Sequence, residues 1–321
     1  MNDDELDEIT KDFESKRAIY EVMAHQAETL IKGKLKTEKF KTAYVVSRVK
    51  DACSFKEKIQ RKGYDKPFEQ MSDIVGIRIV CLYTEDIKLI SRLIGEMFTV
   101  LKEEDKAKSL GSDKIGYRDL HMDVQSKKVE EQLGQCKFEI QLRTIMSDAH
   151  SIIEHDLNYK KTPEFPEALK RELNLINATM ELAQIHSDAL RERRRQFNLE
   201  VEKQARNDGD LMGFLNQPIM DDTLRIYTEK LFPNLPIKEH INALILRDIN
   251  PEKYKKLKDI DKAIQFSKDF VEYYKTKSDS FKSGSDYISK SLGFYDDEFL
   301  RSHPFAQKTR DAVFEFKRGK P

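Results

Sequence analysis

Residues 74–83 read IVGIRIVCLY, between the polar pair Ser72–Asp73 and Thr84. The run is almost continuously apolar and rich in isoleucine and valine. Such a run predicts a strand that is buried on both faces and lies inside a sheet. A strand of this kind needs neighbouring strands on both sides and helices over the sheet, so the run indicates an α/β or α+β domain.

Strand and helix patterns alternate on either side of this run. Further strands are expected at residues 42–46, 119–125 and 137–144, with an edge strand starting at 99–102. Helices are expected at residues 3–32, 49–62, 84–97, 145–160 and 166–205, from apolar residues at helical spacing. Gly63 is expected to end the second of these. The order predicts a mixed sheet.

The rest of the chain is expected to form a separate helical part. The 321 residues suggest two domains, or one domain with an extension. We expect a first domain at 1–205, a glycine- and proline-containing linker at 206–220, and a helical extension at 221–321 whose role no motif indicates. Its apolar helix faces are typical of a core or of an oligomer interface.

Composition excludes several classes of protein. Lys plus Arg and Asp plus Glu both total 57, so the chain lacks the overall positive charge of a general nucleic-acid binder. Its three cysteines form no C-x-x-C pair, which argues against a disulfide framework or zinc site and fits a reducing, cytoplasmic compartment. The acidic N-terminus is unlike a signal peptide, and no apolar run approaches ~18 residues, so no membrane association is expected.

The first polar cluster combines Arg48, Lys50, Ser54 and Lys58. The last three are spaced four apart and would share one face of a helix. Two ammonium groups around a hydroxyl suit a chain of phosphates. A solvated basic helix face has the same spacing.

The second cluster surrounds the central strand. Asp73 at its start could hold Mg²⁺, which takes one or two carboxylates together with substrate phosphates. Arg78 interrupts the apolar run, and a buried guanidinium needs a partner, either a ligand or a structural carboxylate.

The third cluster is GYRDLH at residues 116–121. Tyr117, beside a polar loop, could stack on a base, with His121 nearby. A loop-anchoring tyrosine and a hydrogen-bonded core histidine are the simpler reading of the same residues.

The fourth cluster begins at Glu139, Gln141 and Arg143, which period two places on one face of a strand. Three long polar side chains on one face suggest the wall of a site, although a half-exposed strand would look similar. In the helix that follows, Asn158 could read a base edge. His150 and Glu154 are four apart, but no third residue is spaced to complete a metal site with them.

Taken together, these clusters resemble a known family. SRVKDACSFKEKI, MSDIVGIRIVC, GYRDLH and FEIQLRTIMSDAHSIIEHDLNYK are similar, in order and separation, to the motifs of the RelA/SpoT-type alarmone synthetase domain. The resemblance covers residues 40–165. It implies a mixed five-stranded sheet flanked by helices, and an enzyme that transfers pyrophosphate from ATP to the ribose 3′-hydroxyl of GDP or GTP.

The resemblance also implies roles for the residues. Arg48 and Arg78 would sandwich the adenine. The ATP phosphates would be held by Lys50, Ser54 and Lys58. Asp73 and Glu139 would hold Mg²⁺, and Glu139 would take the proton from the attacking hydroxyl. The acceptor would be bound by Tyr117, His121, Gln141, Arg143, Asn158 and the loop residue Lys114. Related small synthetases form homo-oligomers, so an oligomer is expected.

One residue departs from the family pattern. Asp119 stands where the family commonly has a small hydroxyl residue, and its carboxylate would repel bound phosphates unless it faces away or is paired, for example with Arg118. Acceptor recognition is therefore open. Toxic members that modify the 3′ CCA end of tRNA, with residues 221–318 as a neutralising or sensing module, remain an alternative. A non-catalytic scaffold is a second alternative, although Asp73, Glu139 and Tyr117 are all retained. The hydrolase domain of large members is not expected, since about 40 residues precede the first motif.

Overall fold

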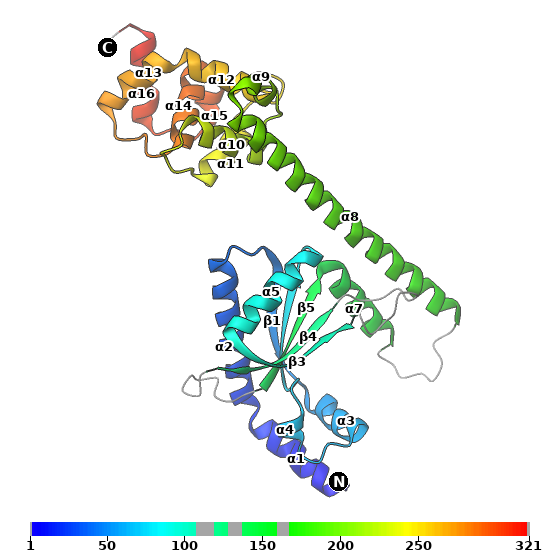
Figure 1. Ribbon diagram of the computed structural model, residues 1–321. Coiled ribbons are helices and arrows are strands. Elements are labelled where there is room, and N and C mark those ends of the chain that lie inside the picture. Colours follow the sequence, from blue (N-terminus) through cyan, green and yellow to red (C-terminus); the bar gives the residue numbers. More distant parts are fainter. Residues whose placement is uncertain (1, 107–118, 128–136, 159–166, 320–321) are drawn as a thin grey trace. The chain divides into compact units, whose positions relative to one another are not determined.

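The computed structural model describes residues 2–106, 119–127, 137–158 and 167–319. The chain forms two compact units, residues 1–191 and 192–321 (Figure 1). The first unit contains α1 (Asp3–Ser15), α2 (Arg17–Thr37), β1 (Thr42–Val49), α3 (Ala52–Lys62), α4 (Pro67–Gln70), β2 (Val75–Cys81), α5 (Thr84–Met97), β3 (Phe98–Asp105), β4 (Leu120–Ser126), β5 (Lys137–Thr144), α7 (Ile145–Asn158) and the start of α8 (Glu167–Arg206).

A five-stranded sheet is the centre of the first unit. The strand order is β1-β2-β5-β4-β3. β2 and β5 run parallel, and the other neighbouring pairs are antiparallel, so the predicted mixed sheet is confirmed. The apolar run at 74–83 contains β2, which is paired on both sides. β3, predicted as an edge strand, lies at one edge.

The two faces of the sheet differ in character. One face is apolar, with side chains such as Ile79, Ile140 and Leu142 fully buried, and α2 and α5 contact the strands. The opposite face carries polar side chains because successive residues of a strand point to opposite sides. We call it the polar face. α7 follows β5 directly and contacts β2 and β5.

The N-terminal part differs from the sequence prediction in two places. The helix expected at 3–32 is two helices, which meet at Lys16. The helix expected from residue 49 begins only at Ala52, because the Asp51 carboxylate accepts a hydrogen bond from the backbone N–H of Ser54 and caps it (2.8 Å). Lys50 therefore precedes α3 and does not share a helix face with Ser54 and Lys58, and Arg48 belongs to β1.

The second unit is built from short helices. After residue 206 these are α9 (Leu211–Leu215), α10 (Asp221–Leu231), α11 (Glu239–Asp248), α12 (Leu257–Phe266), α13 (Lys268–Lys277), α14 (Gly284–Tyr295), α15 (Asp297–Ser302) and α16 (Gln307–Lys317), with a 3-10 turn at Asp208–Asp210. The helical character expected for 221–321 is confirmed over the described residues 221–319.

The segment 206–220 is not the expected linker. Residues 208–215 are helical, and Phe214 on α9 is fully buried in an apolar cluster with Leu224 and Tyr227 of α10. Gly209 and Gly213 suggested a flexible connection, but tertiary packing of one large aromatic side chain outweighs that local signal. In the described part of the chain, no helix has the length and apolar character needed to cross a bilayer.

Candidate active site

The polar face brings together residues from four strands. Register places Arg48 of β1 opposite Gly76 of β2, and Gly76 opposite Glu139 of β5. Gln141, two residues further along β5, is paired with Arg78 of β2 on one side and with His121 of β4 on the other. The predicted residues Arg48, Arg78, His121, Glu139 and Gln141 thus share one face of the sheet. Lys114, Tyr117 and the side chain of Asn158, where α7 ends, lie outside the described residues.

Asp73 lies just before β2 and joins two cations. Its Oδ2 accepts from the ammonium groups of Lys50 and Lys58, each at 2.8 Å. Burial raises the pKa of Asp73, but hydrogen bonds and charge from the two lysines outweigh it, so its pKa lies below the usual value. Its other oxygen, Oδ1, is buried and accepts no hydrogen bond from the described residues. Such an oxygen is suited to a metal ion.

Glu139 is held by two neighbours on the polar face. Its Oε1 is 3.1 Å from Nδ1 of His121, and its Oε2 accepts from Nε2 of Gln141 at 2.5 Å. Burial raises the pKa of Glu139, but the hydrogen bond and charge of His121 and the hydrogen bond from Gln141 together leave it below the usual value. The side chain is therefore an oriented, ionised carboxylate at neutral pH.

Asp73 and Glu139 lie near enough for their charges to interact. The charge of Asp73 raises the pKa of Glu139, and such an effect requires proximity. The hydroxyl of Ser72 donates to Asp123 of β4 (2.7 Å), and Asp123 lies opposite Glu139 in the sheet. Among the described residues no three His, Cys, Asp or Glu side chains cluster as metal ligands. A pair of carboxylates still fits Mg²⁺, which takes its other ligands from water and phosphates.

Arg48 and Arg78 border a cavity on the polar face. The cavity has a volume of about 250 Å³ and is also lined by Val46, Gly76 and Gln141. Arg78 makes an ion pair with Asp148 of α7 at 3.1 Å, so the partner that its position required is a structural carboxylate. The pair holds the guanidinium at one wall of the cavity, and the absence of a side chain at Gly76 leaves the cavity open between the arginines.

Asp119 is buried and paired on the acceptor side of the polar face. It is 3% exposed, its Oδ2 lies 2.9 Å from Nε of Arg143, and it accepts a hydrogen bond from the hydroxyl of Ser147. Burial raises the pKa of Asp119, and the Arg143 charge opposes this shift. The carboxylate is thus compensated within the protein, by Arg143 rather than the suggested Arg118, which is outside the described residues. One guanidinium nitrogen of Arg143 also lies 3.6 Å from Oδ1 of Asp148. Both of these ion pairs are made within the protein, and the contact of Arg143 with an acceptor stays a prediction.

Several residues of the site were not predicted from the sequence. Asp123 lies two residues after His121 on the same face, so strand alternation could have indicated it. Tyr44, whose hydroxyl donates to Asp148, lies four residues before Arg48 and carries the same signal. Asp148 belongs to a helix, and no strand periodicity could have placed it. The hydroxyl of Ser54 hydrogen-bonds the capping residue Asp51, which leaves its predicted phosphate contact a prediction.

Comparison with known proteins agrees with this geometry. Residues 47–164 match the family described as "Region found in RelA / SpoT proteins". Two curated relatives from Bacillus subtilis (strain 168) are GTP pyrophosphokinase YjbM, 34% identical over 137 residues, and GTP pyrophosphokinase YwaC, 31% identical over 134 residues. Each alignment covers 40% of this chain and 63% of the relative, so the chain spans less than two thirds of either protein.

The fold is also found among solved structures. The small alarmone synthetase 1 from Bacillus subtilis superposes with a TM-score of 0.51 at 26% identity, and the match covers 58% of this chain and 98% of that one.

Proposed function

Residues 47–164 form a RelA/SpoT-type domain, and from this premise we propose that the protein is a pyrophosphokinase that converts ATP and GDP or GTP into AMP and a 3′-pyrophosphorylated guanosine nucleotide. The observation that carries the proposal is geometric: Asp73 joins Lys50 and Lys58, and Glu139 is oriented by His121 and Gln141 on the sheet face that carries the arginine-bordered cavity. The two Bacillus subtilis relatives are GTP pyrophosphokinases, which supports the same activity.

ATP would bind with its base between Arg48 and Arg78 and its phosphates at Lys50 and Lys58. Planar guanidinium groups stack on aromatic rings, and the cavity between the two arginines offers room for a base. Both lysines now contact Asp73, so phosphates would share cations already held in position. Pre-positioned cations stabilise charge in phosphoryl transfer without reorganising.

Mg²⁺ would be held by Asp73 and Glu139, with Oδ1 of Asp73 as the oxygen open for it, and would neutralise phosphate charge during the transfer. Glu139 would also receive the proton of the ribose 3′-hydroxyl. The 3′-oxygen then forms a bond to the β-phosphorus, the bond from that phosphorus to the bridging α,β-oxygen breaks, and AMP leaves. His121 and Gln141 orient Glu139 for this role.

The acceptor is the part of the proposal that most needs a test. Purified protein would be incubated with ATP labelled at the β- and γ-phosphates and with GDP, GTP or deacylated tRNA, and AMP and labelled product would be quantified. We expect label on GDP or GTP with one AMP released per transfer. Label on tRNA alone would replace the guanosine nucleotide as acceptor, and no AMP with any acceptor would refute catalysis in favour of a scaffold.

The internal pairing of Asp119 bears on this choice. The departure that raised the tRNA alternative was an acidic side chain near the acceptor phosphates. Because Arg143 and Ser147 engage that carboxylate, it adds little repulsion toward a nucleotide. The described residues offer no observation that favours tRNA over GDP or GTP.

A further inference from the structure

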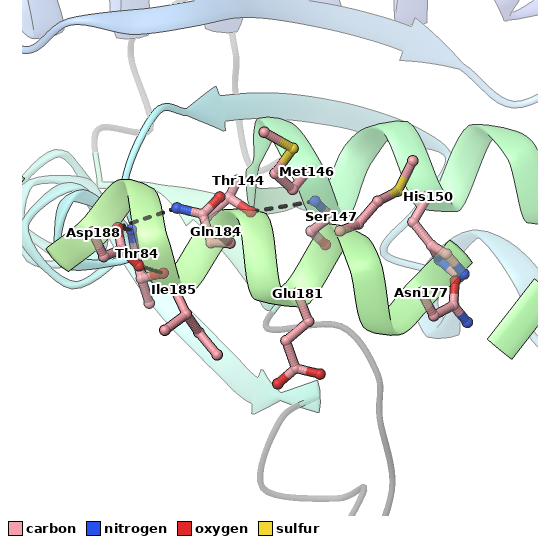
Figure 2. Close-up of a pocket in the computed structure, with 11 residues that line it drawn as sticks. Thr84, Thr144, Met146, Ser147, His150, Asn177, Glu181, Gln184, Ile185 and Asp188 are labelled. Atoms are coloured by element: carbon pink, nitrogen blue, oxygen red, sulfur yellow. Dashed lines mark hydrogen bonds between the residues drawn. The ribbon is translucent and has the colours of Figure 1, made fainter. Parts of the chain in front are cut away.

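A second cavity lies between α7 and the first part of α8 (Figure 2). It has a volume of about 50 Å³, roughly the space of four water molecules. Met146 of α7 and Met180 and Ile185 of α8 give it an apolar lining. We call it the α7–α8 cavity. It shares no lining residue with the cavity between Arg48 and Arg78.

Two acceptor oxygens are left unused in the wall of this cavity. Gln184 is 7% exposed and its Nε2 donates to the carbonyl oxygen of Leu82 and to Asp188, whereas its Oε1 receives no hydrogen bond from the described residues. The buried Oδ1 of Asn177 likewise receives no hydrogen bond from the described residues. A buried acceptor without a donor is unfavourable, because it has lost its hydrogen bonds to water. A ligand with N–H donors would recover part of that cost at both oxygens.

The electrostatic character of the cavity restricts the ligand further. Its described lining contains no lysine or arginine but includes the carboxylates of Glu181 and Asp188. Burial lowers the pKa of His150, against the charges of Glu154 and Asp119, so the imidazole is neutral at pH 7. A phosphate or carboxylate would meet no cation here. The cavity therefore suits a neutral or cationic molecule rather than a nucleotide.

The α7–α8 cavity is connected to the polar face through the first turn of α7. Ser147 lines the cavity and donates to Asp119, which pairs with Arg143 on the polar face. The next residue, Asp148, holds Arg78 at the wall of the proposed ATP cavity. A shift of this turn would change both contacts. A ligand that binds more tightly to one position of the turn would shift the equilibrium toward that position.

We propose that the α7–α8 cavity binds a small aromatic molecule that carries N–H donors and no negative charge, and that its occupancy changes the affinity of the polar face for ATP. The first part stands on the cavity alone. The second part rests on the proposed function, because it assumes that ATP binds at the polar face.

Calorimetric titration of the full chain with benzamidine tests the first part, with benzoate as a probe of the same shape but opposite charge. We expect benzamidine to bind with a millimolar Kd and benzoate not to bind. Asn177→Leu should weaken benzamidine at least fivefold, and Met180→Trp should abolish binding by filling the cavity. Asn174→Leu is the matched control, since Asn174 is an exposed residue on the same helix, and should bind as the wild type does.

Three results would each refute the proposed site: no binding of benzamidine to the wild type, equal binding of benzoate, or equal benzamidine affinity in all three variants. Circular dichroism of each variant separates loss of the site from loss of the fold. For the second part, the Kd of ATP would be measured with and without saturating benzamidine. At least a twofold change in the wild type that disappears in Met180→Trp supports coupling. An unchanged Kd refutes coupling, whereas failure of ATP to bind at all refutes the proposed function and leaves the first part standing.

Discussion

Replacing Gly76 with alanine should stabilise the fold and weaken the binding of ATP. A Cβ at this position would lie 3.5 Å from Cγ and Nε of Arg48, which is ordinary van der Waals contact. Gly76 does not adopt a positive φ, so alanine fits the same backbone. Removing glycine from a strand reduces the freedom of the unfolded chain and should stabilise the fold by about 0.5–1 kcal/mol.

The same methyl group would occupy space between Arg48 and Arg78. A stacked base contributes ~1–3 kcal/mol, and losing about 1.4 kcal/mol of that energy raises Kd roughly tenfold. We therefore expect the Kd of ATP to rise about tenfold and the melting temperature to rise by about 1–4 °C, measured by calorimetry and by thermal denaturation.

Gly95→Ala is the matched control for this experiment. Gly95 lies on α5, where a Cβ would meet only Val100 within 4 Å, at 3.9 Å. This change should stabilise the helix by up to about 1 kcal/mol and leave ATP binding unchanged. If Gly76→Ala binds ATP as tightly as Gly95→Ala does, the base does not lie between the two arginines. A fall of several degrees in melting temperature would contradict the contact geometry itself.

Three further predictions concern other parts of the molecule. Glu139→Gln keeps the shape of the side chain but removes its charge, so turnover should fall at least ~100-fold with little change in melting temperature. The control variant Glu104→Gln, on β3 and on the same face of the sheet, should retain activity. Equal turnover in both variants would exclude Glu139 from the chemistry. The pKa of Asp73 is lowered in the folded state from 3.8, so its contribution to stability is present above pH 3.8 and is lost as the pH falls through the folded pKa. The difference in unfolding free energy between wild type and Asp73→Asn, measured by urea denaturation, should therefore be constant from about pH 5 to 8 and shrink below about pH 4. A difference that widens in acid would reverse the assigned sign. Phe214→Ala should destabilise the second unit by about 3–5 kcal/mol in the same assay, whereas a change below about 1 kcal/mol would restore the view of residues 206–220 as a linker.

Local sequence patterns predicted most of the first unit. β5 and α5 match the expected ranges at both ends, because period two and a helical apolar repeat are properties of neighbouring residues. The helix boundary near Lys50 and the structure of residues 206–220 were predicted incorrectly. In the first case a single capping carboxylate sets the boundary, and in the second the burial of Phe214 outweighs the local glycine signal.

The part of the candidate site that lies on strands could be predicted from the alternation of side chains along each strand. Glu139, Gln141 and Arg143 share a face because their spacing along the backbone requires it. The same reasoning, extended to β1 and β4, would have included Tyr44 and Asp123. Asp148 was out of reach, since its position depends on how α7 packs against the sheet.

The amino-acid order was enough to give the sheet its interior strand and to put cations and carboxylates in the segments that border it, because those features depend on residues close together in the chain. It could not say which carboxylate each cation would meet. Asp73 joins Lys50 and Lys58, Asp119 joins Arg143, and Asp148 joins Arg78. These pairings follow from strand order, register and helix packing, which arise from contacts between residues far apart in the chain.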